Sequence, residues 1–109
     1  MKRMLAVYCF AAFLAAPAAL FGAGDAAAGK EVFLKKCASC HGQNGEGKEA
    51  IAKALKVELK HLGSKEAQAK SDADIKKAIV EGVGKMKPVK DMDAKAIDDS
   101  IAFMRTLKK

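Results

Sequence analysis

Tryptophan is absent from the 109-residue chain, which has one tyrosine and only two prolines. Beyond residue 24 the aromatic side chains reduce to Phe33 and Phe103. A chain of this length forms one domain, and a small core with few large apolar side chains often needs an additional stabilising element. Such a core would gain much from wrapping around a flat apolar cofactor.

The patterns of several other protein classes are also missing. No segment alternates apolar and polar residues as a strand does, and no internal repeat is present. The formal net charge of +7 falls by two if Lys2 and Arg3 are lost with the N-terminal segment, and no strongly basic stripe remains. We therefore expect an all-α domain that does not bind nucleic acid.

The N-terminal segment has the organisation of an export signal. Residues 1–3 are basic at Lys2 and Arg3, residues 4–21 form an apolar run, and small residues follow from Gly22 to Gly29. This order predicts a secretory signal peptide, with a retained transmembrane helix as the alternative.

Pro17 and the small residues that close the apolar run favour cleavage, after either Gly24 or Ala26. We expect a signal peptide at residues 1–24 and a single domain at residues 25–109. The mature protein is then periplasmic, without stable membrane insertion, and we expect it to be a monomer.

Apolar residues at helical spacing, capping residues and glycine breaks predict four helices in the remaining chain. The helices begin after Asp25, at Lys48, after Ser71 and after Asp93, and they end near Cys37, Leu59, Gly82 and the C-terminus. Connecting segments are predicted at residues 42–47, 65–70 and 83–90, the second as a loop or a single helical turn. The last helix is the best defined, because Ile97, Ile101 and Met104 share one face.

Two cysteines and a histidine lie together at Cys37-Ala38-Ser39-Cys40-His41. Cys-X-X-Cys-His is the attachment signature of c-type haem, in which the thiols reach the two vinyl groups and the histidine binds the iron. A thioredoxin-like pair requires a preceding strand, and a structural zinc site requires four ligands, for which only a distant His61 is available in addition. The motif therefore predicts one haem c, bound covalently through Cys37 and Cys40, with His41 as an iron ligand.

The sequence identifies the second axial ligand of the iron less clearly than the first. Met104 lies on the apolar face of the last predicted helix, and Met92 lies at its hydrophobic staple, both positions of core residues. Met86 lies in an irregular loop, Gly84-Lys85-Met86-Lys87-Pro88, where no helical stripe buries it. A soft thioether on a loop braced by proline suits a haem face. We expect Met86 to bind the iron, with Met92 and His61 as alternatives.

Together these pieces resemble the short monohaem class I cytochromes c, the bacterial group similar to cytochromes c-551, c-553 and c6. The matching segments, which follow the expected order, are Gly29–Phe33, Cys37–Gly42, Ser71–Ile75, Gly84–Met86 and Ile101–Leu107. The resemblance implies a cytochrome c fold, with about four short helices around one haem and with His41 and Met86 as axial ligands. It also implies that the first helix meets the last, with Gly29 and Phe33 against Phe103, where the glycine lets an aromatic ring approach the backbone closely.

One residue departs from the family pattern. The family places proline directly after the ligand methionine, whereas here Lys87 separates Met86 from Pro88. The insertion leaves a second function open, a haem-based sensor or small-ligand binder with a weak or absent sixth ligand. A haem peroxidase would need an open iron and a polar distal group, for which the chain offers no candidate.

The predicted function is one-electron transfer between redox proteins, without an enzymatic reaction. Two filled axial positions leave no place for a substrate, and methionine opposite histidine raises the potential because the soft sulfur favours ferrous iron. Five lysines flank the two haem-binding segments: Lys35, Lys36, Lys85, Lys87 and Lys90. They either steer acidic redox partners toward the haem edge or form an ordinary solvated surface.

Overall fold

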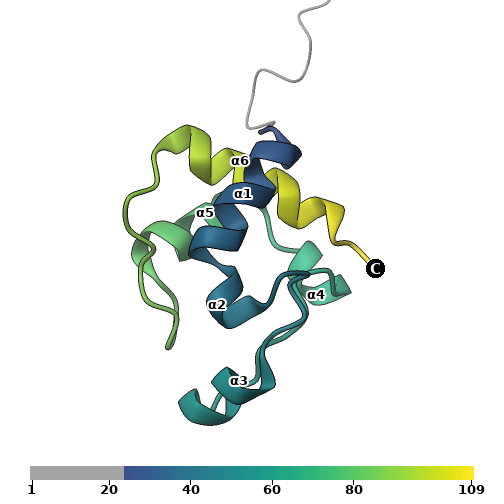
Figure 1. Cartoon of the computed structure of the whole chain (residues 1–109), viewed down its shortest axis with the longest axis vertical. Helices are drawn as coiled ribbons and strands as arrows, with labels where there is room; N and C mark the ends of the chain where they lie inside the picture. The colour runs from purple at the N-terminus through teal and green to yellow at the C-terminus, as the bar shows by residue number, and fades with distance from the viewer. Residues whose placement is uncertain (1–23) are drawn as a thin grey trace, which may run out of the picture.

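The computed structural model describes residues 24–109, which form six α-helices around a small core (Figure 1). The predicted signal peptide lies outside the described residues, apart from Gly24. The helices are α1 (Ala26–Lys36), α2 (Ala38–His41), α3 (Glu49–Leu55), α4 (Lys65–Gln68), α5 (Asp72–Glu81) and α6 (Ala94–Thr106). Within residues 24–109 there is no strand, only an isolated bridge between Val83 and Met86. The all-α class is confirmed. The described part of the chain has two helices more than the four expected, namely the single turns α2 and α4.

Side-chain caps begin the helices at the predicted residues. Asp25, Ser71 and Asp93 each accept a hydrogen bond from a backbone N–H of the following turn, at 2.9, 3.1 and 2.8 Å. Ser64 caps α4 in the same way, so the segment at 65–70 forms a helical turn rather than a loop. Each cap satisfies an N–H that the helix itself leaves unpaired and contributes about 1 kcal/mol.

The helix α3 ends four residues earlier than its periodicity predicts. A helix from Lys48 to about Leu59 was expected, but Lys56 adopts the left-handed conformation (φ 55°) and closes the helix after Leu55. The chain then returns toward the loop of residues 42–47, which contains three glycines, and there the Leu62 N–H donates to the Gly45 carbonyl oxygen at 2.8 Å. This tertiary contact outweighs the local helical pattern.

Two clusters of buried side chains form the core. The larger cluster joins α5 to α6, and its members are Ile75, Ile79, Ile97, Ile101 and Met104. The smaller cluster, Phe33, Ala38 and Phe103, joins α1 and α2 to α6, with the two ring centroids 5.1 Å apart. Met104 is 7% exposed, so its predicted role as a core residue is confirmed.

The crossing of α1 over α6 depends on Gly29 (Figure 1). A Cβ atom there would lie 1.8 Å from the carbonyl oxygen of Asp99. The close approach is therefore between two helix backbones, whereas the resemblance implied an approach of the Phe103 ring. The implied contact of Phe33 with Phe103 is confirmed, one turn further along α1. The crossing fixes the direction in which α1 delivers the chain to α2.

Candidate functional site

The three residues of the Cys-X-X-Cys-His motif lie on the short helix α2 and its cap. Cys37 ends α1 and precedes α2, and its carbonyl oxygen accepts the N–H of His41 at 3.0 Å. Ala38 is buried against the pair Phe33 and Phe103, which anchors α2 to the core. The aromatic contact between the first and last helices thus holds the motif in place.

Both thiols of the motif are free and half-buried. Burial raises the pKa of the Cys37 thiol to about 11. Reactive thiol pairs and thiolate metal ligands require a lowered pKa, because the thiolate is the active form. The raised pKa of Cys37 therefore disfavours a thioredoxin-like pair. In residues 24–109 no group of three or more His, Cys, Asp or Glu side chains is placed to hold a metal ion, so the described residues do not bring together the four ligands of a structural zinc site.

His41 has a buried polar atom without a partner. Its Nδ1 atom is buried and forms no hydrogen bond, which costs about 1–3 kcal/mol when nothing compensates it. Burial also lowers the pKa of His41, which favours the neutral imidazole, the form that binds metals. The ring is thus held in an apolar setting in the protonation state that an axial ligand needs.

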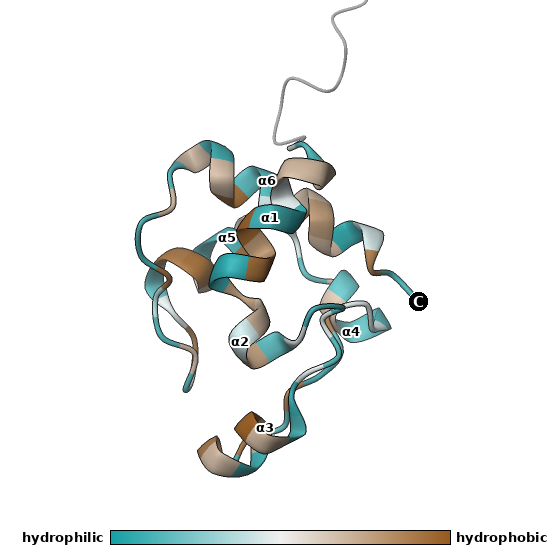
Figure 2. Cartoon of the chain, viewed as in Figure 1, coloured by the Kyte–Doolittle hydropathy of each residue, from teal (hydrophilic) through white to brown (hydrophobic). Residues whose placement is uncertain are grey.

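The apolar surface of the chain also suits a large flat cofactor. The helix α3 buries none of its residues, although its sequence is partly apolar (Figure 2). The side chains of Leu34, Leu55, Val80 and Val83 are 36–57% exposed. Among the described residues, no large side chain is below 2% exposure. Haem would supply the apolar surface against which such side chains pack, so the residues present fit the group.

The structure places the two candidate methionine ligands on the same cluster. Met86 and Met92 are both half-buried and pack against the larger core cluster. The backbone of Met86 is fixed by two hydrogen bonds with Val83, at 2.8 and 3.0 Å, which close the turn at Gly84-Lys85. Met92 precedes Asp93, the cap of α6, and packs on the cluster that contains Ile97, as the staple prediction requires.

Although Lys87 separates Met86 from Pro88, the proline still supports the loop of residues 84–88, the ligand loop. A Cβ atom on Gly82 would lie 2.9 Å from Cδ of Pro88 and 2.7 Å from the carbonyl oxygen of Met86. Pro88 therefore still packs closely against the end of α5, while Lys87 is exposed. At the tip of the turn, the Lys85 ammonium donates to the carbonyl oxygen of Leu55 at 2.8 Å, which ties the loop to α3.

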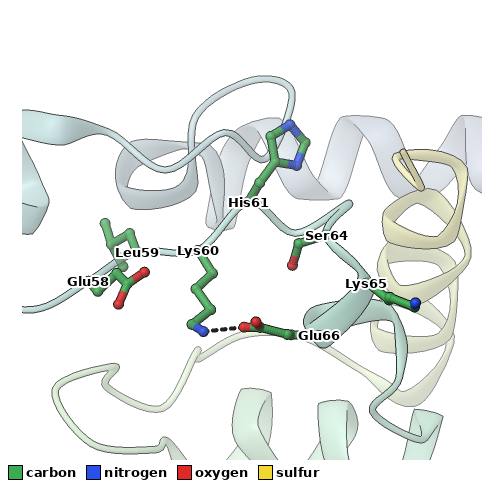
Figure 3. A pocket seen from close by; sticks show the side chains of 7 residues that line it. All are labelled: Glu58, Leu59, Lys60, His61, Ser64, Lys65 and Glu66. Atoms are coloured by element: carbon green, nitrogen blue, oxygen red, sulfur yellow. Dashed lines mark hydrogen bonds and ion pairs between the residues drawn. The ribbon is translucent and has the colours of Figure 1, made fainter.

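The other candidate ligand, His61, borders an open depression of about 370 Å³ (Figure 3). Its ring is turned away from the Lys60–Glu66 ion pair of that depression, and its Nδ1 accepts the N–H of Gly63 at 2.8 Å. The remaining lining is mainly charged and exposed. The histidine of this depression is thus engaged by its own loop.

The sequence patterns did not indicate how residues 62–72 are held to α6. The Gln68 amide donates to the carbonyl oxygens of Leu62 and Met104, at 2.9 and 3.1 Å. Arg105 donates to the carbonyl oxygens of Gln68 and Lys70 and pairs with Asp72. These long-range contacts follow no local spacing, so no motif could have predicted them.

Comparison with known proteins agrees with a covalent haem site. The family model for cytochrome c matches residues 26–108. A cytochrome c6 from Rippkaea orientalis (strain PCC 8801 / RF-1) is 56% identical over 45 residues, which cover 38% of this chain and 39% of that protein. The match therefore spans well under half of the length of this relative.

Two solved structures have a similar fold. The KustC0563 c-type cytochrome superimposes with a TM-score of 0.62 at 27% identity, covering 74% of this chain and 98% of that one. Cytochrome cL from Hyphomicrobium denitrificans gives a TM-score of 0.61 at 26% identity, covering 82% of this chain and 51% of that one.

The fold and the motif define a c-type haem protein with a single attachment site. The chain belongs to the cytochrome c family, as a class I monohaem c-type cytochrome. Its cofactor is one covalently bound haem c, and Cys37 and Cys40 have the spacing that its attachment requires. None of the helices in residues 24–109 is long and apolar enough to span a bilayer.

Proposed function

We propose that the protein is a one-electron carrier whose haem iron is bound by His41 and Met86. The observation that carries the proposal is the buried Nδ1 atom of His41, which has no hydrogen-bond partner, directly after the two free cysteines. Haem supplies a reversible ferric–ferrous couple when bound. Cys37 and Cys40 would hold the group through thioethers, and the buried surroundings of His41 would keep water from that side of the iron.

The backbone around Met86 supports its assignment as the sixth ligand. The turn with Val83 fixes the residue, Pro88 braces the following chain, and the side chain faces the apolar core. A thioether held this firmly loses little freedom on binding, and its softness favours the ferrous state. Met92 is the alternative, but it directly precedes the cap of α6, the position of a hydrophobic staple.

The proposed location follows from the N-terminal segment. Residues 1–24 would act as an export signal that is removed, leaving a periplasmic monomer of residues 25–109. The fold supports this division, because α1 begins at Ala26 and the family match begins at the same residue. The protein would pass electrons between redox proteins and catalyse no reaction itself.

A redox titration of the isolated protein tests the function. We expect a reversible one-electron transition and no binding of carbon monoxide to the ferrous protein at neutral pH, because both axial positions are filled. High-spin iron that binds carbon monoxide readily would contradict electron transfer. That result would support the alternative function, a haem-based sensor with an open sixth position.

The exposed lysines near the two haem-binding segments predict a salt-dependent reaction with acidic partners. All five are exposed: Lys35, Lys36, Lys85, Lys87 and Lys90. Raising the ionic strength from about 0.01 to 0.15 M shortens the Debye length from roughly 30 to 8 Å. We expect the second-order rate with an acidic redox partner to fall by about tenfold or more.

Charge reversal at two positions separates steering from a general effect of charge. Lys85→Glu with Lys87→Glu should lower the low-salt rate strongly. Lys108→Glu with Lys109→Glu changes the net charge equally at the C-terminal end, away from the ligand loop (Figure 1), and should lower the rate much less. Equal effects of the two pairs, or a rate independent of salt, would refute the steering role.

A further inference from the structure

A buried carboxylate lies where the N-terminal end of α1 meets α6. The side chain of Asp99 is only 6% exposed. One of its oxygens accepts the backbone N–H of Asp25 at 2.8 Å, and the other accepts the Lys95 ammonium at 2.6 Å. These two donors lower the pKa of Asp99, the Lys95 contact contributing more, so the carboxylate is charged near neutral pH. The haem site described above makes no use of this group.

The residue before Asp25 also belongs to this contact. A Cβ atom on Gly24 would lie 2.3 Å from the carbonyl carbon and oxygen of Asp98, so only glycine fits against α6 at that point. Gly24 is also the last residue of one of the two small-residue sites at which the export signal could be cut. The donor to the buried carboxylate is therefore the first nitrogen after a cleavage site.

We propose that the export signal is cut between Gly24 and Asp25, and that the new α-ammonium of Asp25 forms an ion pair with Asp99. The inference rests on the proposed export. Hydrolysis adds one water across the peptide bond, leaving the carboxylate on Gly24 and the amine on Asp25. The amide N–H at 2.8 Å is thereby replaced by a charged donor at the same atom, and charge-assisted hydrogen bonds are about twice as strong as neutral ones.

The other candidate site, after Ala26, would remove the groups that begin α1. Asp25 contributes the side chain that accepts the N–H groups of Ala27 and Ala28, and its carbonyl oxygen accepts the Gly29 N–H at 2.8 Å. Loss of Asp25 would also remove the one backbone donor that residues 24–109 provide to Asp99. That carboxylate would then depend on the Lys95 ammonium, whose side chain is 74% exposed. The fold thus favours cleavage after Gly24 over cleavage after Ala26, a choice that the small residues of the sequence do not make.

The charges around the new amine are few. On α6 they are Lys95, Asp98 and Asp99, with Asp93 ahead of the helix, and on α1 the nearest is the carboxylate of Asp25 itself. Asp98 pairs with Lys76 and does not contact the Asp25 nitrogen. Lys95 opposes the positive charge, whereas the carboxylates favour it. Asp99 is in direct hydrogen-bond contact with this nitrogen, at 2.8 Å, so we expect the pKa of the amine to rise above its ordinary value of about 7.7–8.0.

Intact mass and a pH titration of the exported, haem-containing protein test the inference. We expect a chain that starts at Asp25, and an α-amine whose pKa, followed by NMR, is raised by about one unit. Asp99→Asn should return this pKa to near its ordinary value. Asp98→Asn is the matched control, because it removes the same charge from the neighbouring residue, and it should leave the pKa nearly unchanged.

Each other outcome overturns a defined part of the inference. A chain that starts at Ala27 overturns the cut after Gly24 and with it the proposed domain boundary, and a wild-type α-amine with an ordinary pKa overturns the ion pair. In both cases export itself stands. A haem-containing protein that keeps Met1 overturns both the inference and the proposed export. The wild-type titration decides the ion pair by itself if Asp99→Asn fails to fold.

Discussion

Replacing Met86 with alanine is expected to remove the sixth iron ligand while the haem stays covalently attached. The ferric protein should lose the methionine–iron charge-transfer band in the red. The reduction potential should fall by roughly 0.1 V or more, since axial ligands set haem potentials over a span of about 0.8 V. Loss of the thioether removes the ligand that favours ferrous iron. Absorption spectra and a redox titration of Met86→Ala measure both effects.

Met92→Ala and His61→Ala are the controls for this result. Met92 is half-buried on the same core cluster as Met86, so its truncation removes a similar apolar volume. Some loss of stability is expected, because the staple of α6 is weakened, but the band should remain. His61→Ala should leave the band and the potential close to their original values. If Met92→Ala abolished the band and Met86→Ala did not, Met92 would be the ligand.

Gly29→Ala is expected to destabilise the protein, although it improves helix propensity. Alanine in place of glycine inside an exposed helix stabilises by about 1 kcal/mol. Here the added Cβ atom would lie 1.8 Å from the carbonyl oxygen of Asp99, so the two helix backbones would have to move apart. Overpacking typically costs about 1–3 kcal/mol and occasionally more, and a clash between two backbones belongs at the upper end of that range. We therefore expect a net loss of about 2 kcal/mol, measured by denaturant unfolding of the haem-containing protein.

The sign of the change is the informative result, and an exposed neighbour provides the reference. Lys30 lies one residue further along α1 and is exposed. The difference in stability between Lys30→Ala and Lys30→Gly therefore measures helix propensity alone. The glycine variant should be less stable by about 1 kcal/mol. A Gly29→Ala protein as stable as the original, or more so, would show that α1 and α6 do not cross as closely as described.

The sequence predicted those features of the fold that depend on local chemistry. Asp25, Ser71 and Asp93 begin helices because each side chain satisfies an N–H within its own first turn. The attachment motif was recognisable for a similar reason, since one helical turn fixes the spacing of Cys37 and Cys40. These features need no knowledge of the rest of the chain.

The features that could not be predicted depend on contacts between distant residues. The early end of α3 follows from the contact of Leu62 with Gly45, which the apolar spacing up to Leu59 does not reveal. Gly29 was correctly placed at a crossing, but its neighbour is the backbone at Asp99, not an aromatic ring. The choice between Met86 and Met92 is of the same kind, because both pack against one cluster. Their backbones differ, because two hydrogen bonds with Val83 fix Met86, whereas Met92 directly precedes the cap of α6.

Covalent attachment of a single haem through Cys37 and Cys40 is tested by the intact mass of the exported protein under denaturing conditions. We expect the mass of the polypeptide plus one haem, with the haem retained after unfolding. A variant with both cysteines replaced by alanine should carry no covalent haem. A wild-type protein without haem, or one that releases its haem in denaturant, would show that Cys37 and Cys40 do not hold the group.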